Sequence, residues 1–330
     1  MTAQRDHARA AAAHRVHAPR LIARPDVTGA GVGLRRRDGA LTEERVMKVY
    51  VTHKRPLNEL RPDAALPQTI ATEAGEATID VEEMPVPKIP PMHPPARGVA
   101  TGLAEARLRV PRRPAVGGSS IAHHLFPVGT IALGVTDLLT GAPCVLSCNH
   151  VLALLDHALA GDPVLQPSFA DGGALPISAI GQVLRWTNVR FGGPPNRADA
   201  AIAACPPGIA VSYVDGIGPI EAIAPAVELG ETMRKVGRAT GLTSGRVATV
   251  SGTFKGNYAL LGFGNTPALF VDQIVVDMEC GYGDSGSLLV DSQNRAAGLL
   301  FAATDRRHTW FNPFNAVAAA LNIGLMPRAT

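Results

Sequence analysis

The chain has 330 residues, of which 46% are hydrophobic, so it is long enough for one large core and a smaller unit. Its formal net charge of +3 excludes strong polyanion binding by the molecule as a whole. The charge is uneven, because residues 1–61 contain thirteen Lys/Arg and six Asp/Glu, a net of +7, which leaves −4 for the rest. No aromatic residues interleave the first forty positions, so we expect a solvated basic tail and no nucleic-acid partner.

None of the four cysteines belongs to a C-x-x-C pair, so we expect reduced thiols and neither a metal site nor a cofactor. They are Cys144, Cys148, Cys205 and Cys280. The basic N-terminus lacks the unbroken apolar core of a signal peptide, and no segment reaches the roughly 18 apolar residues of a membrane helix. We therefore expect a cytoplasmic protein without membrane contact.

The first part of the chain predicts an arm followed by a small domain. Residues 1–25 are largely Ala, Arg and His without a sustained apolar face, which predicts a mobile basic arm. Strand-like patterns follow at 27–34, 46–52 and 77–82. These elements predict a small α/β domain over residues 26–84.

A proline-rich segment separates this unit from the rest of the chain. Six prolines lie between positions 85 and 95, and proline favours extended backbone over regular structure. We therefore expect the proline run between 85 and 95 to have no regular structure, and residues 85–117 to form a proline-rich linker.

Residues 118–330 contain many short strand-like segments separated by turns with Gly or Pro, which is typical of β-barrels and β-sandwiches. The predicted strands are 129–136, 143–148, 162–166, 179–186, 199–204, 232–236, 244–251, 268–277, 287–291 and 296–303. A single helix is predicted over 314–321, with Asn312 as its N-cap and Pro313 in its first turn. The predicted fold class is mainly β with a C-terminal helix.

The strongest chemical signal is the run Gly283-Asp284-Ser285-Gly286-Ser287. A serine hydroxyl is a weak nucleophile, so it needs a base to take its proton and donors to hold the developing oxyanion. Gly283 lets its own N–H and that of Ser285 point to one place, and Gly286 lets a substrate approach. An ordinary glycine-rich hairpin is the alternative. The serine at position 287 excludes the G-x-S-x-G nucleophile elbow.

Two further residues have the sequence contexts of a catalytic base and its acid. His150 directly follows an apolar strand, in LSCNHVL, where a loop begins. A histidine with a structural role is the alternative there. Asp199 precedes the apolar segment AAIA, and a buried carboxylate is costly without a partner. It therefore either caps a loop or accepts a hydrogen bond from a group such as an imidazole N–H.

The order His150, Asp199, Ser285, with gaps of 49 and 86 residues, resembles the triad of the chymotrypsin–trypsin family of serine proteases. The contexts SCNHV, DAAIA and GDSGS are similar to that family's three signatures, and the similarity covers nearly all of 118–330. The strings LSCNHVLA, GDPVLQP, KVGRATGLTSGRV and GDSGSLLV resemble bacterial trypsin-like proteases and their plant narrow-leaf relatives. In that branch a small domain precedes the protease, and VTGAGVG, VMKVYVTHK and LPQTI resemble it.

The resemblance implies two six-stranded antiparallel barrels and assigns roles to four residues. Ser285 would attack the scissile carbonyl and His150 would accept its proton. Asp199 would hold the imidazole in the required tautomer. The N–H groups of Gly283 and Ser285 would form the oxyanion hole.

The sequence departs from the family pattern at two places. Ser287 replaces a glycine, and 298–303 lacks the serine that bonds the triad acid in many relatives, so the support of Asp199 is left open. Glu279 lies six residues before Ser285, where trypsins carry the acid that binds Arg or Lys at P1. A strand-end glutamate that faces solvent is the alternative.

These observations predict a serine endopeptidase acting on a protein or peptide substrate. A catalytically weak or silent protease fold that serves as a scaffold or binding protein is the alternative. An esterase is a third interpretation, because the triad chemistry is the same and only the substrate pocket differs. The sequence leaves open whether the chain forms a homo-oligomer.

Overall fold

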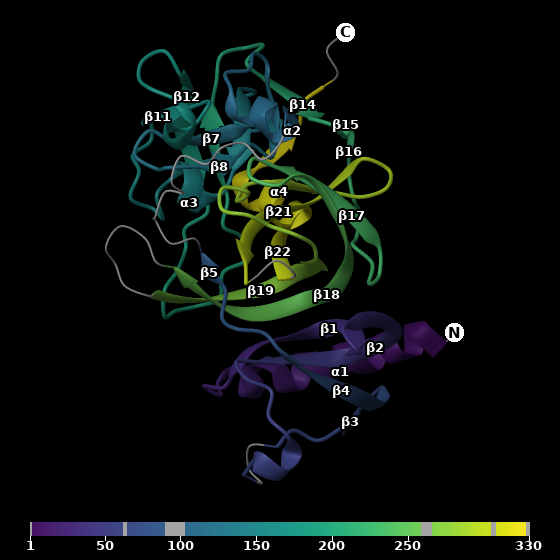
Figure 1. The fold of residues 1–330 in the computed structure, drawn as a ribbon. Coiled ribbons are helices and arrows are strands. Elements are labelled where there is room, and N and C mark those ends of the chain that lie inside the picture. Colours follow the sequence, from purple (N-terminus) through teal and green to yellow (C-terminus); the bar gives the residue numbers. More distant parts are fainter. Residues whose placement is uncertain (1, 62–64, 90–102, 259–265, 305–307, 328–330) are drawn as a thin grey trace.

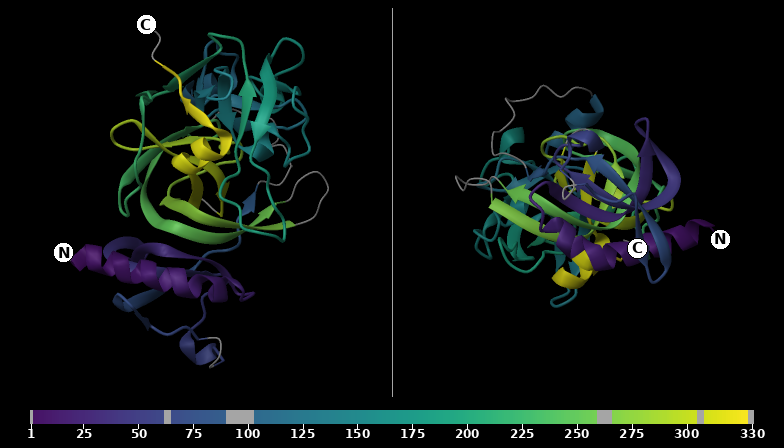
Figure 2. Two further views of the ribbon diagram at one scale, coloured as in Figure 1. Left: turned by 180° about the vertical axis from the view of Figure 1, so that it is seen from behind. Right: turned by 90° about the horizontal axis from the view of Figure 1, so that it is seen from below.

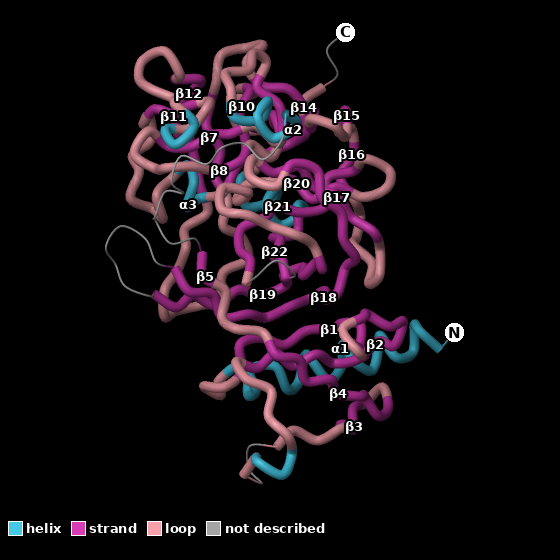
Figure 3. The backbone as a smooth tube through the Cα atoms, viewed as in Figure 1, coloured by secondary structure: helices cyan, strands magenta, loops and turns pink. Residues whose placement is uncertain are grey.

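The computed structural model describes residues 2–61, 65–89, 103–258, 266–304 and 308–327. The chain is mainly β, as the sequence predicted (Figure 3). An N-terminal unit of strands and one helix lies at one end of the molecule, and two barrels follow, with the C-terminus at the far end (Figures 1 and 2). No helix in the described ranges is long and apolar enough to cross a membrane.

The first barrel is built from antiparallel pairs between residues 120 and 204. Its path is β9-β10-β13-β12-β11-β7-β8, and β8 and β9 are consecutive parts of one stretch, so the path returns to its start after six strands. The strands are β7 (Ser120–His123), β8 (Gly129–Thr130), β9 (Leu133–Asp137), β10 (Pro143–Ser147), β11 (Pro163–Leu165), β12 (Ala179–Trp186) and β13 (Ala201–Ala204). The C-terminal strand β23 (Ile323–Leu325) pairs with β9 from outside.

The second barrel is closed by hydrogen bonds. Its path is β17-β20-β21-β22-β19-β18, and β17 also pairs with β18. The strands are β17 (Thr232–Gly237), β18 (Gly241–Tyr258), β19 (Thr266–Asp277), β20 (Leu288–Val290), β21 (Arg295–Ala303) and β22 (His308–Pro313). The fold is therefore the two-barrel fold of chymotrypsin-type proteins, which confirms the predicted fold class.

Short elements connect these parts. A small sheet contains β6 (Ala115–Gly117), β14 (Ala210–Val214) and β15 (Gly218–Pro219), and β16 (Ala222–Ile223) pairs with β21. Helix α2 (Leu103–Ala106) precedes the first barrel. Single 3₁₀ turns lie at Leu57–Glu59, Arg107–Arg109 and Phe169–Asp171.

The C-terminal helix α4 (Phe314–Leu321) has the predicted bounds. The predicted cap is wrong, because Pro313 occupies the N-cap position and the structure gives no side-chain hydrogen bond there. Asn312 belongs to β22, and its side chain bonds another part of the chain instead.

The N-terminal unit differs from the expected mobile arm. Residues Thr2–Ile22 form helix α1, which packs on β1 (Val27–Arg37), β2 (Ala40–Val51) and β4 (Gly75–Glu83), with β3 (Thr69–Thr72) beside β4 (Figure 1). Ala10, Ala13 and Ala18 are buried on its inner face. Alanine has the highest helix propensity, and its small side chain lets the helix lie close to the sheet. The prediction of a mobile arm is wrong because the buried face of this helix contains mostly alanine, which is too weakly apolar to stand out in the sequence.

The N-terminal unit continues the sheet of the second barrel. Strand β1 pairs antiparallel with β18, for example Gly29 with Phe254, and Phe254 is fully buried. The domain boundaries expected at positions 26 and 84 stay a prediction. The pairing shows that the two parts share one hydrogen-bonded sheet.

Buried charges also join the N-terminal unit to the second barrel. Arg36 donates to Asp277 at 2.7 and 2.8 Å and to Glu82 at 2.8 Å. Lys48, which has no exposed surface, donates to Glu82, and His308 Nε2 lies 3.1 Å from Glu82 Oε1. Burial alone would raise the pKa of Glu82, but the partners His308, Lys48 and Arg36 hold it far below its usual value.

Part of the expected linker, residues 90–102, lies outside the described residues. In the described part, Lys88–Ile89 forms the short strand β5, which pairs with Tyr258 in β18 and with Ala303 in β21. The expectation that this segment has no regular structure is therefore wrong. Proline prevents donation only at its own position, so the residues between prolines can join a sheet.

Candidate active site

The pairing of β10 with β13 brings the predicted base and acid together. Ser147 lies opposite Ala201 across this pair. Helix α3 (Asn149–Leu152) follows β10 and carries His150, and Asp199 lies two residues before β13. His150 Nδ1 lies 2.7 Å from Asp199 Oδ2, and the His150 backbone N–H donates to Asp199 Oδ1 at 3.1 Å. Both side chains are buried.

Two residues that the sequence did not assign to the site hold Asp199 from the second barrel. The Tyr258 hydroxyl donates to Asp199 Oδ2 at 2.6 Å, and Asn312 Oδ1 accepts the Asp199 backbone N–H at 3.0 Å. The Asn312 amide in turn donates to Gln273 Oε1 at 2.6 Å. Burial alone would raise the pKa of Asp199, but His150 and Tyr258 hold it below its usual value. Tyr258 thus supplies the support that a serine on β21 would have given.

The segments that carry Ser285 and His150 meet at one carbonyl oxygen. Cys148 Sγ donates to Leu300 O at 3.0 Å, and the Gly286 N–H donates to the same oxygen at 2.8 Å. Ser285 is 5% exposed and His150 is 1% exposed. Among the residues that the structure describes, none hydrogen-bonds His150 Nε2, the nitrogen that would take the serine proton.

Two glycines shape the loop around Ser285. Gly283 and Gly286 have φ angles of 98° and 97°, in the left-handed region that favours glycine. A Cβ at Gly286 would lie 2.2 Å from Ser147 Oγ and from Thr130 O. Gly286 therefore lets the loop lie against the first barrel, whereas we had expected it to admit substrate. No acceptor in the described ranges bonds the N–H groups of Gly283 or Ser285, so both predicted oxyanion donors are available.

Thr130 connects this loop to the first barrel. Its hydroxyl donates to Gly283 O at 2.6 Å and accepts the Arg238 N–H at 3.0 Å. Its own backbone N–H donates to Ser285 O at 2.8 Å. Thr130 lies in β8, so these bonds fix the loop that carries Ser285 relative to the barrel that carries His150. No sequence pattern indicated this role.

Asp284 lies between Gly283 and Ser285, and its buried carboxylate is close to several hydrogen-bond donors. Lys235 Nζ lies 3.0 Å from Asp284 Oδ2, and the Thr240 hydroxyl donates to the same oxygen at 2.6 Å. The N–H groups of Ala239 and Gly281 donate at 2.8 and 3.0 Å. Burial alone would raise the pKa of Asp284, but these partners, Lys235 foremost, hold it below its usual value.

Glu279 is not brought into the catalytic group. Its side chain is exposed, and its backbone oxygen accepts a weak hydrogen bond of 3.5 Å from Thr243 Oγ1. This is the arrangement of a solvent-facing glutamate beyond the end of a strand, here β19. Binding of a basic P1 side chain by Glu279 stays a prediction.

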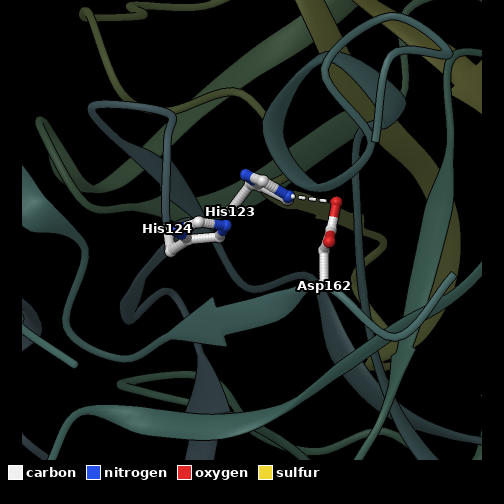
Figure 4. A group of neighbouring side chains, drawn as sticks. All are labelled: His123, His124 and Asp162. Carbon is white, nitrogen blue, oxygen red and sulfur yellow. Dashed lines mark hydrogen bonds and ion pairs between the residues drawn. The ribbon is translucent and has the colours of Figure 1, made fainter. Parts of the chain in front are cut away.

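Among the residues that the structure describes, two groups of side chains have the composition of a metal site. The hydrogen bonds of the first group argue against a metal there. Figure 4 shows His123, His124 and Asp162. His123 Nδ1 accepts the Leu125 N–H at 3.1 Å, so the ring proton is on Nε2, which lies 3.1 Å from Asp162 Oδ2. A nitrogen that carries a proton has no lone pair for a cation. His123 and Asp162 therefore form a hydrogen-bonded pair.

The second group is Cys148 with His150 and Asp199, whose ligand atoms lie within 4.8 Å of one another. Burial raises the pKa of Cys148 well above its ordinary value, with a further contribution from the charge of Asp199. Its Sγ–H is used on Leu300 O. Cys148 therefore makes a buried hydrogen bond next to His150 and Asp199.

No protein-family model matches the chain, and no curated protein matches it. Solved structures with a similar fold are bacterial serine proteases of the chymotrypsin type. A glutamic-acid-specific serine protease is 19% identical with a TM-score of 0.47, over 64% of this chain and 100% of that one. Thermobifida fusca protease A (14% identical, TM-score 0.46) and Cellulomonas bogoriensis chymotrypsin (17%, 0.44) each match 64% of this chain and 98% of their own.

Proposed function

We propose that the protein is a serine endopeptidase that cleaves peptide bonds through an acyl-enzyme on Ser285. His150 Nε2 accepts the hydroxyl proton as Ser285 Oγ attacks the carbonyl carbon, and Asp199 stabilises the imidazolium that forms. The N–H groups of Gly283 and Ser285 hold the oxyanion. His150 then donates the proton to the leaving amine, and water hydrolyses the acyl-enzyme with His150 again as the base.

The observation that carries this proposal is the arrangement of the His150 ring. Nδ1 is bonded to the buried carboxylate of Asp199 at 2.7 Å, which leaves the lone pair of the neutral ring on Nε2. That nitrogen has no partner among the described residues, and the segments that carry Ser285 and His150 meet at the carbonyl oxygen of Leu300. Activation of a serine requires a base that is oriented through one ring nitrogen and has an unbonded lone pair on the other.

A protein with the same site but little or no catalysis is the second candidate. The low exposure of Ser285 (5%) and His150 (1%) favours it, and so does the fact that, among the described residues, Ser285 makes no hydrogen bond to His150 Nε2. Catalytic hydrogen bonds are often long before substrate binds, so this observation does not outweigh the first. A protein or peptide remains the proposed substrate or partner, and the four unpaired cysteines support a reducing, cytoplasmic location.

Hydrolysis by a matched pair of variants tests the proposal. Purified wild type should cleave fluorogenic peptides, and Ser285→Ala should lower the rate by several orders of magnitude while it keeps the folded state. Ser292→Ala, which changes an exposed serine seven positions further along, should keep the wild-type rate. A folded wild type without any hydrolysis would favour the scaffold. Undiminished cleavage by Ser285→Ala would contradict the assignment of the nucleophile.

The finer proposal, cleavage after Arg or Lys, depends on Glu279 alone. A carboxylate pairs bidentately with guanidinium, so arginine at P1 should be preferred over citrulline, its neutral analogue. The preference should disappear in Glu279→Gln. Equal kcat/KM for the two peptides in the wild type would contradict this specificity and leave the proposed reaction untouched.

A further inference from the structure

Tyr258 is the only side chain besides His150 that donates to the Asp199 carboxylate among the described residues. Its hydroxyl oxygen lies 2.6 Å from Asp199 Oδ2, the same oxygen that lies 2.7 Å from His150 Nδ1. Asp199 has no exposed surface and Tyr258 is 1% exposed, so water does not compete for this contact. One carboxylate oxygen is therefore held between the ring of the base and a phenol.

The phenol is a donor in this contact. Burial, with a further contribution from the charge of Asp199, raises the pKa of Tyr258 well above its ordinary value. The hydroxyl therefore keeps its proton over the whole range in which a protease works. The Tyr258 hydroxyl proton needs a hydrogen-bond acceptor, and the structure provides the Asp199 carboxylate.

The ring of Tyr258 is fixed by its neighbours. It packs edge-on against Phe191 with 5.6 Å between ring centroids, lies 6.3 Å from Phe270, and meets the His150 ring edge-on at 6.4 Å. Its backbone pairs with Ile89 of β5 on one side and with Thr266 of β19 on the other. These ring contacts and strand pairings hold the Tyr258 side chain in place, so its hydroxyl has a fixed position.

We propose that Tyr258 is the positioning residue of the triad, which fixes the Asp199 carboxylate against His150 and moderates its charge. This inference rests on the proposed function, because it assigns to Tyr258 a part in that reaction. The O–H dipole has its positive end at Asp199 Oδ2, so it lowers the attraction of the carboxylate for an imidazolium. Cys148 and Asp156 are the other titratable groups that face Asp199 from neighbouring segments. Cys148 stays neutral at working pH, and Asp156 is already bonded to Asn149 and to the Val189 N–H.

Tyr258→Phe removes the hydroxyl and keeps the ring. We expect kcat to fall roughly tenfold with KM nearly unchanged, since a hydrogen bond to a charged group is lost away from the substrate. The acid limb of the kcat/KM profile should move to higher pH, because the carboxylate then favours the protonated imidazole more strongly. Tyr50→Phe is the matched control, because Tyr50 is also fully buried and its hydroxyl lies 2.6 Å from Thr249 Oγ1. That variant should leave the pH profile in place.

A measurement without substrate separates this inference from the proposed function. The pH at which the His150 ring signals titrate in NMR spectra should rise in Tyr258→Phe and stay unchanged in Tyr50→Phe, whether or not the protein cleaves peptides. A fluorotyrosine placed at position 258 is a stronger donor and should shift this titration in the opposite direction, which keeps the test open if Tyr258→Phe does not fold. Titration of His150 at the wild-type pH in these variants would overturn the inference. If the protein does not hydrolyse peptides but the His150 titration shifts as expected, the proposed function is contradicted and the inference about Tyr258 stands.

Discussion

Lys235 and Asp284 form an ion pair whose two side chains have no exposed surface, with 3.0 Å between Lys235 Nζ and Asp284 Oδ2. Asp284 lies between Gly283 and Ser285, whose N–H groups are the predicted oxyanion donors. The carboxylate also accepts hydrogen bonds from Thr240 and from backbone N–H groups. The conformation of the loop that carries Gly283 and Ser285 therefore depends on a charge from β17.

Lys235→Met should destabilise the fold and lower kcat, because it leaves Asp284 buried without a counter-charge. Removal of one partner of a buried pair typically lowers the free energy of unfolding by about 3–5 kcal/mol. Urea unfolding and peptide hydrolysis measure the two effects. The double variant Lys235→Met/Asp284→Asn should recover part of the stability. Arg197→Met is the control, since Arg197 pairs with Asp272 at the surface, where the side chains are 69% and 53% exposed. Equal stability of Lys235→Met and Arg197→Met would refute the importance of the buried pair.

Asp199→Asn should keep the fold and lower kcat by about four orders of magnitude. An amide can donate to His150 Nδ1, which stabilises the tautomer with its proton on Nε2, so the base has no lone pair for the serine proton. Single-turnover hydrolysis compares the variant with wild type, and circular dichroism checks the fold. Near-normal turnover of Asp199→Asn, combined with loss of turnover in Asp162→Asn or Asp215→Asn, would move the role of the acid to another residue.

The fold should lose stability in acid. Glu82, Asp199 and Asp284 have pKa values below their usual range in the folded protein. A carboxylate with a depressed folded-state pKa stabilises the fold above its unfolded pKa, about 4, and this stabilisation is lost as the pH falls further. The melting temperature should therefore be level near neutral pH and fall progressively below about pH 4.5. Glu82→Gln should show a shallower fall, whereas a melting temperature that rises toward pH 3 would disprove the linkage.

A chain without residues 1–84 should be less stable and more prone to aggregation than the whole protein. The deletion removes β1 from β18, which leaves backbone donors and acceptors of a long strand exposed. It also leaves Asp277 and His308 without Arg36 and Glu82. Thermal unfolding and size-exclusion chromatography compare the two forms. A monomeric truncated chain that melts at the temperature of the whole protein would show that the N-terminal unit is an independent domain.

The candidate catalytic residues could be proposed from the sequence because their signals are local. Each signal lies within a few residues of the residue it marks: the glycines around Ser285, the apolar strand before His150 and the apolar strand after Asp199. Tyr258 and Lys235 gave no such signal. Tyr258 ends the long strand β18 and Lys235 lies in the shorter strand β17. Each reaches the site only through the register of its strand, which depends on pairing across the barrel. A local sequence pattern cannot predict side-chain partners that are brought together by long-range strand pairing.

Two errors have related causes. The helix α1 was missed because Ala10, Ala13 and Ala18 form a weakly apolar face whose burial depends on the sheet beneath it. Asn312 was assigned as a helix cap because asparagine is common at that position, yet its side chain accepts the Asp199 N–H. In both cases the tertiary partner decides the role of the residue.

Covalent labelling of Ser285 tests the central claim most directly. A fluorophosphonate probe reacts with a serine only where a base activates the hydroxyl and donors hold the developing charge. Intact-mass measurement should show one adduct per chain, peptide mapping should place it on Ser285, and Ser285→Ala and His150→Ala should each abolish it. Native protein that remains unlabelled after prolonged exposure, or an adduct on another residue that persists in Ser285→Ala, would contradict the account.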